Sequence, residues 1–340
     1  MGSSTELPNW RRTRKSPVLS RQPDQNKPKR RTLPESVRRL RPDATQRDAT
    51  LMTDFTIRPA TLADQEFIAS WTSATFSWGD YVGDAFGDWL EDDRCAVIVA
   101  DVDGRAVSLG RIRMVSESEA WANAMRVHPD YRRRRIGSAI GDAICDWARS
   151  VGAQVIRLAV EDWNEPALNL VEESGFRSLG NWQWAQRGVG DSSPVPEGNG
   201  GMRVKGYEAL KPAAAAEAEP ALLSWSGGDL ARAAHGLFGS GWTWQRLTKA
   251  HLVAAAKNLM LWEGRPGWAL AERDDDLFRV HWIETTPEDA KAMVRALVER
   301  AADSGADRVR VVIPEVDWLI QAFRRAGFET GGVTIFGLAL

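Results

Sequence analysis

A strand–turn–helix–strand pattern between residues 120 and 160 constrains the fold of this chain more than any other feature. Residues 120–127 (AWANAMRV) read as a strand, and residues 136–150 carry an apolar stripe at helical spacing. Residues 155–160 (VIRLAV) form a near-continuous apolar run, which is typical of a buried parallel strand. The pattern predicts an α+β (mixed α/β) fold.

The segments on either side extend this pattern. Phe55–Ala60 alternates like a strand, and residues 96–115 read as a hairpin with its turn at residues 103–104 (Asp-Gly). After the last strand of the pattern, Asn164 is expected to cap a short helix that ends at Gly175. Strands and helices therefore continue from about residue 54 to residue 176.

The second half of the chain contains an echo of the same unit. Residues 150–160 (SVGAQVIRLAV) resemble residues 303–313 (DSGADRVRVVI) at an offset of 153 residues, and the same offset places Met125–Val127 on Phe278–Val280. Such self-similarity indicates a repeated supersecondary unit. We therefore expect four segments: a disordered basic tail (1–51), a first domain (52–211), a linker (212–221) and a second α/β domain (222–340).

The charge distribution argues against a nucleic-acid-binding fold. The formal net charge is −2, but residues 1–51 are basic and the remainder of the chain is acidic. Residues 1–51 are rich in Arg, Pro and Ser and lack an apolar period, so we expect a solvated tail. A basic arm that touches nucleic acid or a membrane is the less favoured alternative.

Cysteine and histidine usage gives no sign of a metal site or a disulfide framework. The chain has two cysteines, Cys95 and Cys145, and four histidines without ligand spacing. It has no apolar run of about 20 residues and no apolar core typical of a signal peptide. We therefore expect a cytoplasmic protein with no metal and no membrane span.

The turn after the strand at residues 120–127 has the residues of an anion site. Four consecutive arginines, Arg132 to Arg135, precede Gly137 and Ser138, which open the next helix. The N-terminus of a helix presents unpaired N–H groups and a partial positive charge. A pyrophosphate is the natural occupant of such a site, and arginines add charge-assisted contacts.

Two segments of the chain carry a family signature. The first contains Val127, Pro129, Arg132 and Gly137, and the second contains Asn164, Ala167, Leu170, Gly175 and Phe176. In their residues and order, these segments resemble the GNAT (GCN5-related) N-acetyltransferase superfamily. The resemblance covers about 160 residues of this chain, and the echo makes the arrangement resemble a tandem with a degenerate second GNAT-like domain.

The resemblance implies the GNAT fold, with a central, mixed and twisted sheet flanked by helices. It also implies an enzyme that uses acetyl-CoA as a substrate. It implies acetyl transfer to a primary amine by direct attack in a ternary complex, with a small molecule or an amino acid favoured as acceptor. Two residues depart from the family pattern. Arg135 stands at a glycine position, and Val171 stands where many members have a tyrosine that protonates the departing thiolate. A non-catalytic CoA-binding or interaction module is therefore the alternative.

The resemblance and the strand alternation together give candidate site residues. Glu119 and Glu117 are the expected catalytic bases, with Glu161 and Asp162 as further acids near the cleft. Asn164 is either a helix cap or a cofactor-facing amide, and the aromatic residues Trp78, Tyr81, Trp89 and Trp121 line an acceptor pocket or belong to the core. The expected acetyl-CoA-binding residues are Met125, Val127, Arg132, Arg133, Arg134, Arg135, Gly137, Ser138 and Asn164.

The second domain lacks the features of this anion site. The offset places Thr285–Ala290 (TTPEDA) on the arginine loop, where it offers no arginine and two acids, Glu288 and Asp289. These carboxylates would repel a pyrophosphate. We expect one acetyl-CoA per chain and a structural role for the second domain.

Overall fold

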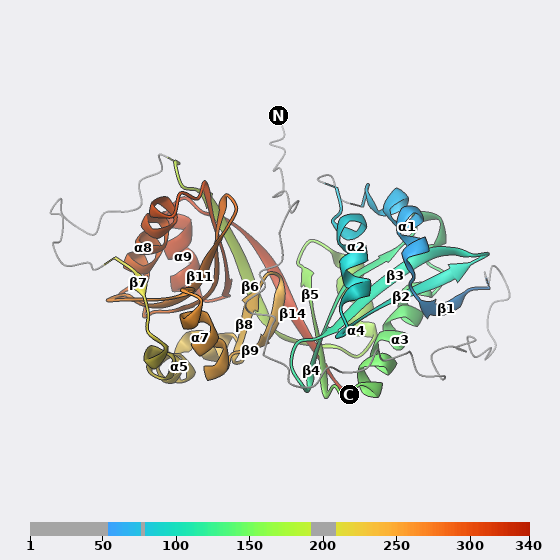
Figure 1. Ribbon diagram of the computed structural model, residues 1–340, viewed down its shortest axis with the longest axis horizontal. Coiled ribbons are helices and arrows are strands. Elements are labelled where there is room, and N and C mark those ends of the chain that lie inside the picture. The colour runs from blue at the N-terminus through green and yellow to red at the C-terminus, as the bar shows by residue number, and fades with distance from the viewer. Residues whose placement is uncertain (1–53, 76–78, 192–208) are drawn as a thin grey trace.

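Two α/β halves share one continuous sheet in the computed structural model, which describes residues 54–75, 79–191 and 209–340 (Figure 1). The expected tail at residues 1–51 and Trp78 lie outside these ranges. Within them, no helix has the length and apolar character needed to cross a bilayer. The twelve strands of the sheet follow the order β1-β2-β3-β4-β5-β14-β6-β13-β12-β11-β10-β7.

The first half, residues 54–188, confirms the predicted mixed sheet flanked by helices. Its strands are β1 (Thr56–Pro59), β2 (Cys95–Val102), β3 (Arg105–Met114), β4 (Glu119–Val127), β5 (Val155–Glu161) and β6 (Arg177–Gly188). Its helices are α1 (Gln65–Thr72), α2 (Val82–Glu91), α3 (Ile136–Ser150) and α4 (Glu165–Glu173), with short 3₁₀ turns at Leu62–Asp64 and Pro129–Tyr131.

Helices cover both faces of this part of the sheet. The apolar stripe of α3 packs on one face, where Ile140 and Ile144 press so closely on β3 that a Cβ at Gly110 would lie 2.6 and 2.8 Å from their side chains. On the other face, α1 and α2 bury Ile68 and Phe86. The missing side chain of Gly110 thus allows α3 to pack closely on the sheet at this position.

The central strands β4 and β5 are paired only at one end. Glu119–Trp121 pairs in parallel with Val155–Arg157, and no further pairs follow between these two strands. Beyond that point, Ala124 has φ 58° and the β3–β4 register shifts between Leu109 and Arg111, which marks a β-bulge. The carboxyl ends of β4 and β5 therefore diverge, with the loop into α3 at the mouth of the gap.

The second half, residues 209–340, repeats the strand–helix–strand order. Its strands are β7 (Lys211–Pro212), β8 (Leu237–Ser240), β9 (Thr243–Arg246), β10 (Leu261–Gly264), β11 (Gly267–Asp274), β12 (Leu277–Glu284), β13 (Arg308–Pro314) and β14 (Glu329–Ala339). Its helices are α5 (Ala218–Gly227), α6 (Asp229–Ala233), α7 (Lys249–Lys257), α8 (Ala290–Asp303) and α9 (Asp317–Arg325), with a 3₁₀ turn at Ala215–Glu217. Residues 212–221, expected to be a linker, thus include the end of β7, this turn and the start of α5.

The offset of 153 residues between the two halves holds for β5 and β13 but not for β4 and β12. β13 begins 153 residues after β5, as the sequence offset requires. However, the residue opposite the start of β5 is Glu119, whereas the residue opposite the start of β13 is Leu277. The alignment of Met125–Val127 with Phe278–Val280 is therefore shifted, because the loop before α8 (285–289) is shorter than the loop before α3 (128–135).

The last strands of the two halves are exchanged. β14 lies between β5 and β6, and β6 lies between β14 and β13, all in antiparallel pairs. In Figure 1 these two strands pass side by side between the halves. Each half therefore completes its sheet with a strand of the other.

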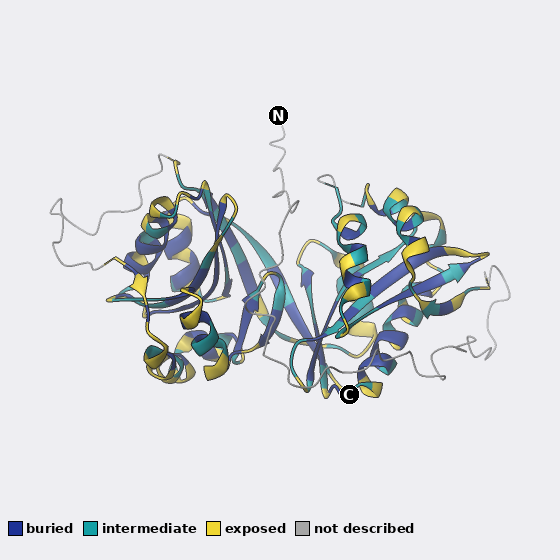
Figure 2. Cartoon of the chain, in the orientation of Figure 1, coloured by how far each residue is buried: buried dark blue, intermediate teal, exposed yellow. Residues whose placement is uncertain are grey.

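A hairpin of the second half covers the junction. β8 and β9 form a two-stranded sheet whose turn has Gly241 and Trp242 at positive φ, as a tight hairpin turn requires. Trp244 of β9 stacks on Trp121 of β4 at 5.6 Å between ring centroids and meets Trp182 of β6 edge-on at 5.8 Å. The buried residues at the centre of Figure 2 thus form a core shared by both halves.

Candidate functional site

The loop from β4 to α3 has an unusual backbone. Arg133 has φ 61° and Arg135 has φ 59°, so two non-glycine residues are left-handed within three positions. Arg135 directly precedes α3 and occupies its N-cap position. This is the position at which the family signature has glycine, so the chain keeps a glycine-like backbone there with an arginine side chain.

The four arginines of this loop divide into two kinds. Arg132 Nε donates to the Val127 carbonyl at 3.3 Å, and Arg134 Nη2 donates to the Asp130 carbonyl at 2.9 Å. Arg133 and Arg135 are exposed and form no ion pair with any described residue. Two side chains thus brace the loop, and two point free charge toward solvent near the first turn of α3.

The first turn of α3 adds backbone donors to this charge. Ala139 donates to the Arg135 carbonyl, as the first helical bond does, so the N–H groups of the residues before it are open to a ligand. A Cβ at Gly137 would lie 3.3 Å from the Leu170 side chain of α4 and 3.9 Å from Val127. Gly137 therefore brings α4 close to this turn, and the exposed Ser138 follows it.

The remaining predicted acetyl-CoA residues line the same end of the sheet. The side chains of Met125 and Val127 are partly buried against the core under α3. Asn164 caps α4, because its side chain accepts a hydrogen bond from the Ala167 N–H at 3.4 Å. The cap is one of the two roles expected for Asn164, and its contact with acetyl-CoA stays a prediction.

Glu119 and Glu117, the expected bases, lie at the end of β4 opposite the arginine loop. Glu119 is 9 % exposed, accepts from Arg157 Nη2 at 3.0 Å and accepts from the Arg246 N–H at 3.3 Å. Glu117 is exposed in the turn between β3 and β4. The base role of either residue stays a prediction, and Glu119 also ties the first half to β9.

A second acid–base cluster lies across the diverging ends of β4 and β5. The fully buried Asp80 carboxylate accepts from Arg126 Nε at 2.9 Å and from the Val82 N–H at 3.1 Å. Glu161 ends β5 on the same face as Arg157, two pairs of residues further along. Burial raises the pKa of Glu161, and a hydrogen bond with the Trp163 side chain and the nearby positive charge of Arg126 oppose this rise.

Asp162 extends this cluster toward the exchanged strand. Its N–H donates to the Gly332 carbonyl at 3.2 Å, and its Oδ1 accepts from Thr334 Oγ1 at 3.1 Å. A Cβ at Gly332 would lie 1.9 Å from Asp162 Oδ2, so only glycine leaves room for this carboxylate. The second half thereby fixes the end of β5 that carries Glu161.

Sequence reasoning missed two members of this cluster. Arg126 lies within the signature strand, where its charge was visible, but the bulge at Ala124 changes the face to which it points. Asp80 carried no signal, because its role depends on its position before α2. Of the expected aromatic residues, Tyr81 and Trp89 meet edge-on at 5.9 Å beside α2, whereas Trp121 is buried against Trp244.

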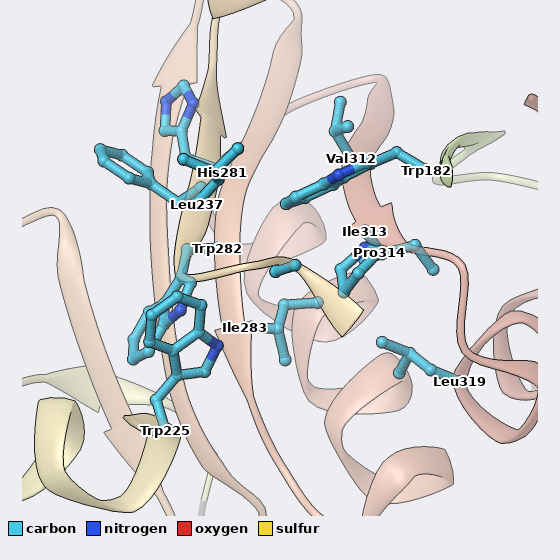
Figure 3. A pocket seen from close by; sticks show the side chains of 12 residues that line it. Trp182, Trp225, Leu237, His281, Trp282, Ile283, Val312, Ile313, Pro314 and Leu319 are labelled. Atoms are coloured by element: carbon cyan, nitrogen blue, oxygen red, sulfur yellow. The ribbon is translucent and has the colours of Figure 1, made fainter. Parts of the chain in front are cut away.

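The corresponding gap in the second half is filled. The β12–β13 pairing ends at Val280 and Val311, and the residues beyond it line a cavity of about 10 Å³, room for one water molecule. Figure 3 shows Trp182, Trp225 and Trp282 in this place, with His281 above them. No described arginine lines the cavity.

Comparison with known proteins finds a family that part of the chain matches. Residues 64–176 match the acetyltransferase (GNAT) family. No curated protein matches the chain.

Several solved structures that resemble the chain cover most of its length, including both halves. A GCN5-related N-acetyltransferase from Sphaerobacter thermophilus has a TM-score of 0.60 at 14 % identity and covers 84 % of this chain and 95 % of its own. A tandem GNAT protein from the clavulanic acid biosynthesis pathway has a TM-score of 0.54 at 13 % identity, over 84 % and 98 % of the two chains. A putative acetyltransferase from Pyrococcus horikoshii has a TM-score of 0.50 at 18 % identity, over 87 % and 93 %.

At these identities the likeness to solved structures shows the fold, and the family match shows the kind of domain. Both agree with the predicted GNAT fold, and the family match spans the residues from Val127 to Phe176. The segment from residue 64 to residue 176 therefore resembles a GNAT acetyltransferase domain in both sequence and fold.

Proposed function

We propose that this protein transfers the acetyl group of acetyl-CoA to a small primary amine, in a single site between β4 and β5. The observation that carries the proposal is the left-handed arginine loop at residues 132–135, which leads into α3 at the mouth of the diverging strands. Acetyl-CoA supplies an acyl group already activated as a thioester. The filled gap between β12 and β13 supports one site per chain.

The residues of the loop fit the phosphates of this substrate. The N–H groups that open α3 and the exposed guanidinium groups of Arg133 and Arg135 are all donors suited to an anion. Gly137 carries no side chain that would cover these N–H groups. The unpaired edge of β4 beyond Trp121 offers further backbone N–H groups for the acyl carbonyl, as the family resemblance implies.

The proton of the attacking amine needs an acceptor, and we assign this role to Glu161. The C–N bond forms as the C–S bond breaks, one proton passes from the amine to Glu161 directly or through water, and the departing sulfur takes a proton from solvent. Burial raises the pKa of Glu161, which is the direction that favours a general base. Glu119 is less suited, because Arg157 and the Arg246 N–H already engage both of its oxygens.

Release of the CoA thiol with a panel of primary amines tests this function. Glu161→Gln should abolish the acidic limb of the pH–rate profile, whereas Glu119→Gln should lower thermal stability and keep that limb. The reverse result would return the base role to Glu119. Acetyl-CoA binding without thiol release with any amine would instead favour the non-catalytic module, for which Val171 on α4, unable to donate a proton, is the supporting observation.

A further inference from the structure

Arg111 is a half-buried cation without an anionic partner. It lies within β3 on the α2 side of the sheet, where its Nε donates to Cys95 Sγ at 3.2 Å and its Nη1 to Asn123 Oδ1 at 3.3 Å. Its guanidinium also lies 5.1 Å from the ring centroid of Trp89. No carboxylate among the described residues forms an ion pair with it. Neutral contacts of this kind position a guanidinium but leave its charge uncompensated.

The surroundings of Arg111 are themselves rich in positive charge. Arg113 Nε lies 3.1 Å from Asp92 Oδ2. Burial lowers the pKa of Arg113, Asp92 opposes this effect, and Arg111 and Arg94 lower the pKa further. Arg113 thus has one carboxylate, Asp92, and two further guanidinium groups, those of Arg111 and Arg94, in its surroundings.

Unused donors continue toward β5 on the same face. Trp121 pairs with Arg113 on one side and with Arg157 on the other. Arg157 is 6 % exposed, and its Nε and Nη1 have no hydrogen-bond partner among the described residues, while its Nη2 binds Glu119. The face therefore presents guanidinium groups on β3 and β5, and two donors of Arg157 have no partner among the described residues.

The register places Arg111 next to the point of acyl transfer. Arg111 pairs with Asn123, and the following residue, Ala124, forms the bulge where β4 has left β5. Neighbouring strands lie about 4.8 Å apart. A group bound to Arg111 is thus about one strand spacing from an amine held at the edge of β4. This separation fits an acceptor whose anionic group and amine are only a few carbon atoms apart.

We propose that Arg111 binds a carboxylate of the acceptor, so that the substrate class is amino acids and similar amines that carry a carboxylate. This inference rests on the proposed acetyltransferase function. The planar guanidinium can bind a carboxylate through two parallel hydrogen bonds, and Asn123 and Trp89 hold it in place for that contact. Arg111 is then the residue that distinguishes a carboxylate acceptor from a neutral amine.

Matched pairs of acceptors test this role. Each amino acid of a panel is compared with its own carboxamide, which keeps the amine and the side chain but lacks the negative charge. We expect Arg111→Gln to lower the preference for the carboxylate, measured as the ratio of kcat/KM values, by about tenfold to a hundredfold. The loss should appear in KM, and kcat with the carboxamides should not change.

Two further variants keep the test decisive. Arg111→Lys keeps the charge without the planar fork and should retain an intermediate preference, even if the Gln variant folds poorly. Arg105→Gln, at the exposed start of the same strand, should behave as the unaltered protein. If both members of each pair are acetylated and the Arg111 variants do not change the ratio of their kcat/KM values, the role of Arg111 is wrong. The proposed acetyltransferase function would stand in that case. Thiol release with neither member, despite acetyl-CoA binding, would overturn the acetyltransferase function itself.

Discussion

Arg135 is the position at which backbone shape and side-chain charge can be separated by mutation. It is left-handed, with φ 59°, and exposed at the N-cap of α3. The left-handed conformation costs a residue with a Cβ roughly 1–2 kcal/mol. Glycine avoids this cost, but its greater freedom in the unfolded chain reduces the advantage by roughly 0.5–1 kcal/mol. Arg135→Gly should therefore be about 1 kcal/mol more stable than Arg135→Ala.

Both substitutions remove the same guanidinium from the anion site. A well-formed charge-assisted hydrogen bond contributes roughly 1.5–3 kcal/mol, but exposed ion contacts usually contribute less than about 1 kcal/mol. Because 1.4 kcal/mol corresponds to about tenfold in Kd, we expect Arg135→Ala to weaken acetyl-CoA binding about threefold to tenfold at low salt. The loss should shrink at high salt. Arg135→Gly should lose less, because its backbone can approach the phosphates more closely.

Calorimetric titration and thermal unfolding measure these two effects separately. The variants are titrated with acetyl-CoA and with acetyl-pantetheine, which lacks the pyrophosphate, and Arg149→Ala at the other end of α3 is the control. Equal losses for the two ligands would refute a contact between Arg135 and the pyrophosphate. Equal melting temperatures for the Gly and Ala variants would refute the strained backbone.

Three other outcomes are expected. Titration with acetyl-CoA should give one site per chain, and two equivalent sites would contradict the filled gap in the second half. Gly137→Leu should abolish acetyl-CoA binding and lower the melting temperature, since even a Cβ lies 3.3 Å from Leu170, whereas Gly137→Ala should retain binding. Burial raises the pKa of Glu284, against the hydrogen bond from Ser224. Its folded pKa thus exceeds its unfolded value, so stability is lost as pH rises through that range, and Glu284→Gln should raise the melting temperature at pH 8 but not at pH 4.

The local elements of the first half could be predicted from the sequence because their signals are local. The apolar stripe at residues 136–150 gave the bounds of α3, and the Asp-Gly pair at residues 103–104 gave the turn between β2 and β3. The strand exchange was not predictable in this way. The alternation within β6 or β14 specifies which face is buried, but no period specifies which strand lies beside it.

The same distinction between local signals and long-range contacts applies to the candidate site. The signature residues from Val127 to Gly137 form one continuous segment, and the structure keeps them together at the mouth of the gap. The partners of Glu119 are Arg157 on β5 and the backbone of Arg246 on β9, both distant in sequence. The Glu119 carboxylate, which the sequence alone gave no reason to expect buried, is therefore buried because the β8–β9 hairpin of the other half covers it.

The strand exchange also dictates the order in which the chain can fold. β5 pairs with β14 through contacts such as Val155 with Ala339, and β14 is synthesised after every other strand of the sheet. Until then, β5 and β6 present open edges, which are templates for pairing between chains. Closing such a long loop adds little to its entropic cost, which grows only logarithmically, but long-range pairing slows folding. In a nascent chain, the arginine loop at residues 132–135 is therefore complete while the β5 edge is still unpaired, and that edge is covered only after α9 has been synthesised.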